Sequence, residues 1–112
     1  MKQHEVPRQE WGSFLGTFSD AHRAWLATLE GADARAEERP LDSVESSGGA
    51  IVIHFHDAAD VRIDAPLSVR VAQTDRGEDL GLDIESSRGV TRLRFRAAAL
   101  PEALDGIGPA GR

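Results

Sequence analysis

The sequence predicts an α+β fold in which an N-terminal helix packs on an antiparallel meander sheet of five or six strands. Two observations carry this prediction. Short runs of alternating apolar and polar residues follow one another closely, separated by Gly, Pro, Asp and Ser, and a one-sided apolar stretch precedes them. The helix would then cover the apolar face of the sheet.

The clearest local signal is a β-hairpin at Asp79–Arg96. Each half alternates, because side chains of a strand point to opposite faces. The two apolar sets are Leu80, Leu82 and Ile84, and Thr91, Leu93 and Phe95. The loop is either Ser87-Arg88 or Arg88-Gly89. In both registers Leu82 faces Leu93 or Phe95 while Asp83 faces Arg92 or Arg94, so one face is apolar and the other is ion-paired.

An amphipathic helix is predicted for Arg8–His22. Pro7 suits the first turn, and the apolar face is formed by Trp11, Phe14, Leu15, Phe18 and His22. Gly12 and Gly16 each lower the helix propensity by about 1 kcal/mol relative to Ala. Tertiary packing must therefore hold this helix in place.

The middle of the chain contains one strand, one ambiguous segment and one loop. Ala24–Glu30 reads as a strand with Trp25, Ala27 and Leu29 on one face. Ala32–Arg39 fits either a strand or a helical turn, and Pro40 prevents a helix from continuing. Ser43–Gly49 is polar and ends in Ser-Ser-Gly-Gly, which predicts a loop.

Three further strands are predicted before the hairpin, at Ala50–His56, Val61–Ile63 and Leu67–Gln73. Ile51, Ile53 and Phe55 form the apolar face of the first, and Leu67, Val69 and Val71 form that of the third. Pro66 marks an edge, a bulge or a corner. We expect one domain over residues 1–107, which includes a short helical turn at Leu100–Ile107, and a frayed tail over residues 108–112.

Composition narrows the classes of function. The chain has 112 residues, a net charge of −6 and no Cys. It has neither an apolar leader nor a run approaching the ~20 apolar residues that span a bilayer, so we expect a soluble, cytoplasmic protein without membrane contact. The negative charge disfavours nucleic acid. The basic stripe Arg92, Arg94 and Arg96 is balanced by Glu78, Asp79, Asp83 and Glu85, which predicts cross-strand ion pairs.

No catalytic motif is recognisable. The sequence lacks GxxxxGK[ST], GxSxG and HExxH, and no GxGxxG lies between a predicted strand and a helix, so no catalytic or cofactor-binding residue is assigned and an enzyme is disfavoured but left open. His54 and His56 share one face of a strand and are weak metal candidates, because two ligands do not make a site. Trp11, His22 and Trp25 are the candidates for a ligand site or an interface, although the packing of helix on sheet is the more common use of such residues.

Three segments resemble, in the same order, a family of small bacterial proteins catalogued only as a domain of unknown function. The first carries Pro7, Arg8, Glu10, Trp11, Phe18, Ser19, His22 and Trp25. The second is ERPLDSV, and the third is TRLRFRAAALPEALDGI, with its Leu-Arg-Phe-Arg strand followed by Leu-Pro-Glu. The resemblance implies no activity, ligand or catalytic residue.

The sequence therefore favours a non-enzymatic interaction or accessory protein with an unidentified protein partner. The alternative is a small-ligand or metal-binding protein that uses the Trp11/Trp25/His22 region or His54/His56. One short helix covers only part of the predicted sheet, and an open meander exposes two edges, so we expect a homodimer. Asp64 and Pro66 are placed to guard one edge, which keeps a monomer as the competing expectation.

Overall fold

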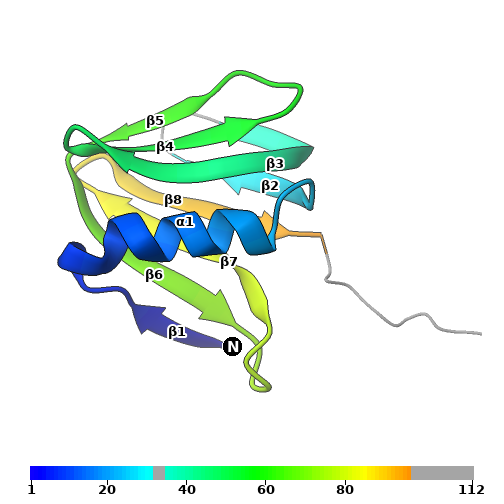
Figure 1. The fold of residues 1–112 in the computed structure, drawn as a ribbon, viewed down its shortest axis with the longest axis horizontal. Helices are drawn as coiled ribbons and strands as arrows, with labels where there is room; N and C mark the ends of the chain where they lie inside the picture. Colours follow the sequence, from blue (N-terminus) through cyan, green and yellow to red (C-terminus); the bar gives the residue numbers. More distant parts are fainter. Residues whose placement is uncertain (32–34, 97–112) are drawn as a thin grey trace, which may run out of the picture.

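The computed structural model describes residues 1–31 and 35–96 and contains one α-helix and a large antiparallel sheet (Figure 1). The α+β class is confirmed. The predicted number of five or six strands is wrong, because the sheet has eight. The strands are β1 (Lys2–Glu5), β2 (Leu26–Glu30), β3 (Arg35–Ser47), β4 (Ala50–Phe55), β5 (Val61–Asp64), β6 (Pro66–Gln73), β7 (Asp79–Ser86) and β8 (Gly89–Phe95).

The sheet is assembled from two meanders rather than one. Its order is β1-β6-β7-β8-β2-β3-β4-β5, so β2 to β5 form one meander, β6 to β8 form the other, and β8 pairs with β2 to join them. β1 pairs with β6 and forms the edge of the sheet at that end. Its four residues are polar and exposed, so no hydrophobic alternation marks it in the sequence.

β3 accounts for two differences from the sequence prediction. It includes residues 35–39 of the ambiguous segment and Ser43–Ser47 of the predicted loop, whereas residues 32–34 lie outside the described part. Val44 is 1% exposed and pairs with Ile53 on β4. Pairing with an apolar neighbour therefore outweighs the polar composition, and only Gly48 and Gly49, with φ of 56° and 80°, form the turn.

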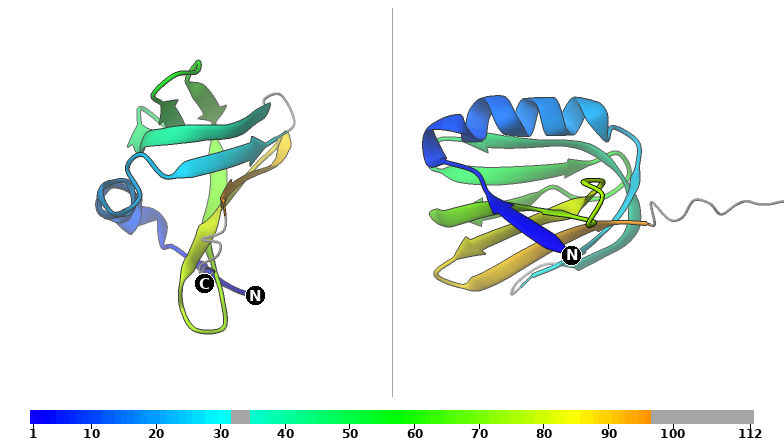
Figure 2. Two further views of the ribbon diagram at one scale, coloured as in Figure 1. Left: turned by 90° about the vertical axis from the view of Figure 1, so that its right-hand side faces the viewer. Right: turned by 90° about the horizontal axis from the view of Figure 1, so that it is seen from below.

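A sharp corner between β5 and β6 curls the sheet. Ala65 alone separates these strands, although β5 stands at one end of the sheet and β6 is the second strand from the other end. Ala65 has a φ of 46°, which is unusual for a residue with a Cβ atom. The sheet must bend strongly to bring the two strands into succession, as the two views of Figure 2 show. Pro66 therefore marks a corner.

The N-terminal helix is shorter than predicted. A 3₁₀ turn at Arg8–Glu10 leads into α1 (Trp11–Ala21), and His22 is the C-cap residue. Trp11, Leu15, Phe18 and Ser19 are buried. Figure 1 shows α1 running across the face of the sheet, and its core residues pack with residues of strands β2 to β8. The predicted role of the helix as a cover for the apolar face is confirmed.

The hairpin is confirmed with its loop at Ser87-Arg88. Ser86 pairs with Gly89, Leu82 with Leu93, and Asp83 with Arg92. The inward assignment of Leu67 is wrong, because its side chain is 58% exposed. The pairing of β6 with β7 shifts between Pro66 and Ser68, so Leu67 lies in a bulge that breaks the alternation. The predicted turn at Leu100–Ile107 and the tail at residues 108–112 lie outside the described residues.

Candidate functional site

The imidazole of His22 is buried on the inner side of the sheet and contacts both polar and aromatic groups. The side chain is 4% exposed and stacks on Phe95, with ring centroids 4.6 Å apart. Its Nδ1 lies 2.7 Å from the carbonyl oxygen of Phe18, and its Nε2 lies 3.2 Å from Oδ2 of Asp79. The ring therefore joins the last turn of α1 to the start of β7.

The two Trp residues occupy different environments. Trp25 contacts the rings of both His22 and Phe95 and is 43% exposed. The predicted packing of Trp25 into the core is therefore wrong. The chain turns sharply at Ala24, whose φ is 72°, and β2 begins only at Leu26, so Trp25 precedes the strand and does not follow its alternation.

Trp11 lies at the other end of α1. It is 5% exposed, its Nε1–H donates to the carbonyl oxygen of Val6 at 2.9 Å, and the Arg8 guanidinium lies 4.4 Å from the ring centre. Eleven helical residues span ~16 Å, so the predicted Trp11/Trp25/His22 region is not one site. The structure brings His22 and Trp25 together and separates Trp11 from both.

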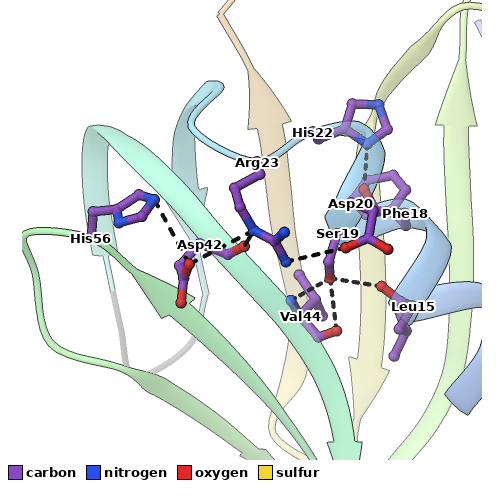
Figure 3. A network of polar contacts seen from close by, with 9 residues as sticks. All are labelled: Leu15, Phe18, Ser19, Asp20, His22, Arg23, Asp42, Val44 and His56. Carbon is purple, nitrogen blue, oxygen red and sulfur yellow. Dashed lines mark hydrogen bonds and ion pairs between the residues drawn. The ribbon is translucent and has the colours of Figure 1, made fainter.

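Ser19 ties α1 to a free part of β3 (Figure 3). β2 pairs with β3 only as far as Pro40, and Leu41 bonds to the backbone of Ala24 and Trp25, so the residues after Leu41 lack a strand on that side. The Ser19 hydroxyl accepts from the Val44 N–H at 2.8 Å and shares its own hydrogen between the carbonyl oxygens of Leu15 and Val44. The sequence contained no signal for this role beyond the helical position of Ser19.

These contacts limit the chemistry of the buried polar groups. A serine nucleophile needs a free hydroxyl beside a base, but the Ser19 hydroxyl is held by three backbone groups. The His22 ring likewise contacts a backbone carbonyl and a carboxylate. Both side chains connect elements of the fold, which favours a structural role.

A second histidine centre lies on the outer side of β3, β4 and β5. His54 Nε2 is 2.8 Å from Oε2 of Glu45, and its Nδ1 is 3.0 Å from Oδ2 of Asp60. The hydrogen bond to Glu45 raises the pKa of His54 most, and Asp60 raises it further against the lowering effect of partial burial. The ring therefore bridges two carboxylates, and both contacts favour its protonated form.

This arrangement does not favour the metal candidates. The two carboxylates contact opposite nitrogens of the His54 ring, so they do not converge on one point. His56 is directed to another carboxylate, with its Nε2 3.7 Å from Oδ1 of Asp42 (Figure 3). Within residues 1–31 and 35–96, no three His, Asp or Glu side chains form a group that could hold a metal ion.

The outer face of the other strands carries a row of alternating charges. Neighbouring positions across six strands hold, in order, Glu5, Arg70, Asp83, Arg92, Glu30 and Arg35. Asp83 is only 3% exposed, and its Oδ1 lies 2.8 Å from Nη1 of Arg94. Its other oxygen accepts a hydrogen bond from the Gln3 amide. The row holds three acids and three bases, so its formal charges sum to zero.

Two Arg residues of the stripe, Arg94 and Arg96, have ion pairs within the described residues, but not with the set of acids that was predicted. Of the four acids proposed, Asp83 forms an ion pair with the stripe, through Arg94, whereas Arg96 contacts Glu38 of β3 at 3.4 Å. The other three acids bind elsewhere: Asp79 contacts His22, Glu85 contacts Arg70, and Glu78 contacts Thr74. Pairing across the whole sheet was not visible from the hairpin sequence.

Comparisons with known proteins found no relative: no protein family, curated protein or solved structure matches the chain. In the part of the chain that the structure describes, no helix is long and apolar enough to cross a membrane. The geometry of the described residues must therefore carry the functional argument alone.

Proposed function

We propose that the protein is a small, non-enzymatic interaction or accessory protein that works by associating with another protein surface, first of all with a second copy of itself. One observation carries this proposal. The sheet ends in β1 on one side and β5 on the other, and neither strand has a second strand neighbour within the described residues. Unpaired strand edges present N–H and C=O groups that readily bind another chain.

The contacts of three buried or partly buried polar side chains support the same proposal. His22, His54 and Ser19 each contact structural partners through their polar atoms. Association requires surface and unpaired backbone rather than a nucleophile. Because the chain has no Cys, we expect it to act in the reducing cytoplasm.

A ligand-binding function is the second candidate, and Trp25 is the observation that favours it. Its indole is 43% exposed beside the rings of His22 and Phe95, so a flat apolar molecule has a surface on which to stack. This candidate ranks second because His22 already contacts Phe18 and Asp79. The resemblance to the bacterial family of unknown function stays a prediction and assigns no ligand.

Native mass spectrometry of protein purified from its own host separates these functions. We expect a species with twice the 12.1 kDa chain mass and no added mass from a small molecule. A denatured sample of the same preparation is the control, because it gives the mass of the single chain. A single-chain species that carries a small molecule would favour the ligand site at Trp25 and count against self-association.

A further inference from the structure

Within the described residues, no strand pairs with the outer edge of β5. β5 is the last strand of the sheet, and its partner there is β4, with Ile63 opposite Ile51 and Val61 opposite Ile53. Figure 1 shows β5 along the top of the molecule, with β4 beneath it. One side of this strand therefore remains open to a further strand.

The direction of the backbone groups identifies which residues face outward. The N–H of Ala65 donates to the carbonyl oxygen of Gly49 in the chain just before β4, at 3.2 Å. Backbone groups point alternately to the two sides of a strand, so Val61 and Ile63 share the direction of Ala65 toward β4. The N–H and C=O groups of Arg62 and Asp64 then point to the free edge.

The charges on these two residues are already complementary. Arg62 and Asp64 are exposed, and Nε of Arg62 lies 2.7 Å from Oδ1 of Asp64. Asp64, which the sequence suggested as a guard of the edge, is thus neutralised by its neighbour. The edge of β5 carries one positive and one negative side chain on the same outer face.

Symmetry selects the register of a pair of such edges. Two identical antiparallel strands in one continuous sheet are related by a twofold axis perpendicular to the sheet, which keeps each face on its own side. A pair centred on Ile63 places Arg62 opposite Asp64 of the second copy, twice. Both residues direct their backbone groups outward, so they form hydrogen-bonded pairs, while the two Ile63 residues meet on the inner face.

Other symmetric pairings confined to the residues of β5 or β1 lack this complementarity. Centring β5 on Arg62 places two Arg side chains opposite each other. On β1, centring on Gln3 places Lys2 opposite His4, and centring on His4 places Gln3 opposite Glu5. None of these registers pairs opposite formal charges when His is neutral, and cross-strand charge complementarity contributes to pairing.

We propose that β5 pairs with β5 of a second copy in the antiparallel register centred on Ile63, so that two sheets join into one. The proposal rests on the proposed self-association and specifies its surface. Two four-residue strands bury little area, so the dimer forms in a concentration-dependent manner rather than permanently.

Two opposite charge reversals test this register. R62D gives the edge two acids and D64R gives it two bases, so each variant opposes like charges across the twofold axis. We expect each substitution to raise the dissociation constant of its own dimer at least about tenfold. Light scattering across a concentration series measures this constant. Circular dichroism checks that both variants are folded.

Mixing the two variants supplies the decisive measurement. The acidic edge of one variant matches the basic edge of the other in the proposed register, so an equimolar mixture should form a heterodimer that neither variant forms alone. A folding defect would not be repaired by mixing. R35D is the matched control, because Arg35 forms a similar exposed pair with Glu37 on β3, away from the edges, and should leave the association unchanged.

The failures of the two proposals are distinguishable. If the wild-type chain dimerises but R62D and D64R dimerise equally well, the β5 register is overturned while self-association stands. If the wild-type chain keeps its 12.1 kDa mass at high micromolar concentration, both the register and the self-association are overturned.

Discussion

At the scale of single residues, polar side chains connect elements that hydrophobic packing alone would leave loosely joined. His22 links the C-cap of α1 to Asp79 on β7, and Ser19 links the last turn of the helix to the backbone of β3. Each supplies a hydrogen bond to a polar group that would otherwise be buried without one. A buried polar group without a hydrogen bond costs about 1–3 kcal/mol. These residues therefore stabilise the relative positions of helix and sheet.

His54 makes the stability of the β3–β4–β5 region dependent on pH. Because Glu45 and Asp60 raise the pKa of His54 above its ordinary 6.5, the stabilising contribution is fully present below that value. It is lost as the pH rises through the higher pKa of the folded state. We expect H54Q to lower the melting temperature more at pH 5.5 than at pH 9.

The controls for this prediction use the partners of His54. An NMR titration should show E45Q lowering the pKa of His54 more than D60N does, because the Glu45 hydrogen bond is the larger cause. H56Q is the matched control, because His56 is 46% exposed and its contact with the carboxylate of Asp42 is longer, at 3.7 Å. Equal destabilisation by H54Q at both pH values would refute the bridging role.

At the scale of elements, α1 has two roles. Its apolar face covers the core side of the sheet, and Ser19 occupies backbone groups of β3 where β2 has ended. The helix thus protects a length of strand edge that lies inside the sheet order. The edges that remain free in the described residues are the two ends of the sheet, so association is expected there.

The two Trp residues give a matched test of this packing. W11A should lower the free energy of unfolding by about 3–5 kcal/mol, because the side chain is 5% exposed and its N–H is bonded to Val6. W25A removes the same side chain from a 43% exposed position and should cost clearly less. Denaturant unfolding measures both values. Similar losses for the two variants would contradict the assignment of Trp11 to the core.

At the scale of the whole molecule, opposite charges are interspersed. The net charge is −6, yet the outer face of the sheet alternates acids and bases strand by strand. Arg94 and Arg96, the stripe residues with identified ion pairs, contact Asp83 and Glu38. A polyanion such as a nucleic acid would therefore be repelled by the net negative charge. It would also meet two Arg side chains that are already in ion pairs.

We expect no appreciable binding to nucleic acid at moderate ionic strength. Fluorescence anisotropy with a labelled DNA duplex and a labelled single-stranded RNA should show no saturation at micromolar protein. D83N removes one internal partner of the stripe and serves as a comparison, because any added affinity would then come from a freed Arg. Tight binding by the wild-type chain that weakens steeply with salt would overturn the prediction.

The sequence by itself determined the features that depend on local periodicity. Alternation located the hairpin and its two faces, and the helical spacing of Trp11, Leu15 and Phe18 identified the buried side of α1. The same reasoning selected Trp11, His22 and Trp25 as notable residues. It did not separate Trp11 from the other two, because periodicity gives a direction within an element but no distance between its ends.

Only the tertiary structure decided which segments pair. β1 is polar throughout, and the second half of β3 has the composition of a loop, yet both are strands because a neighbouring strand accepts their backbone hydrogen bonds. The bulge at Leu67 and the partners of the Arg stripe also depend on neighbours that are remote in sequence. Such contacts depend on how strands that are remote in sequence align across the sheet, and alternation within one segment does not specify that alignment.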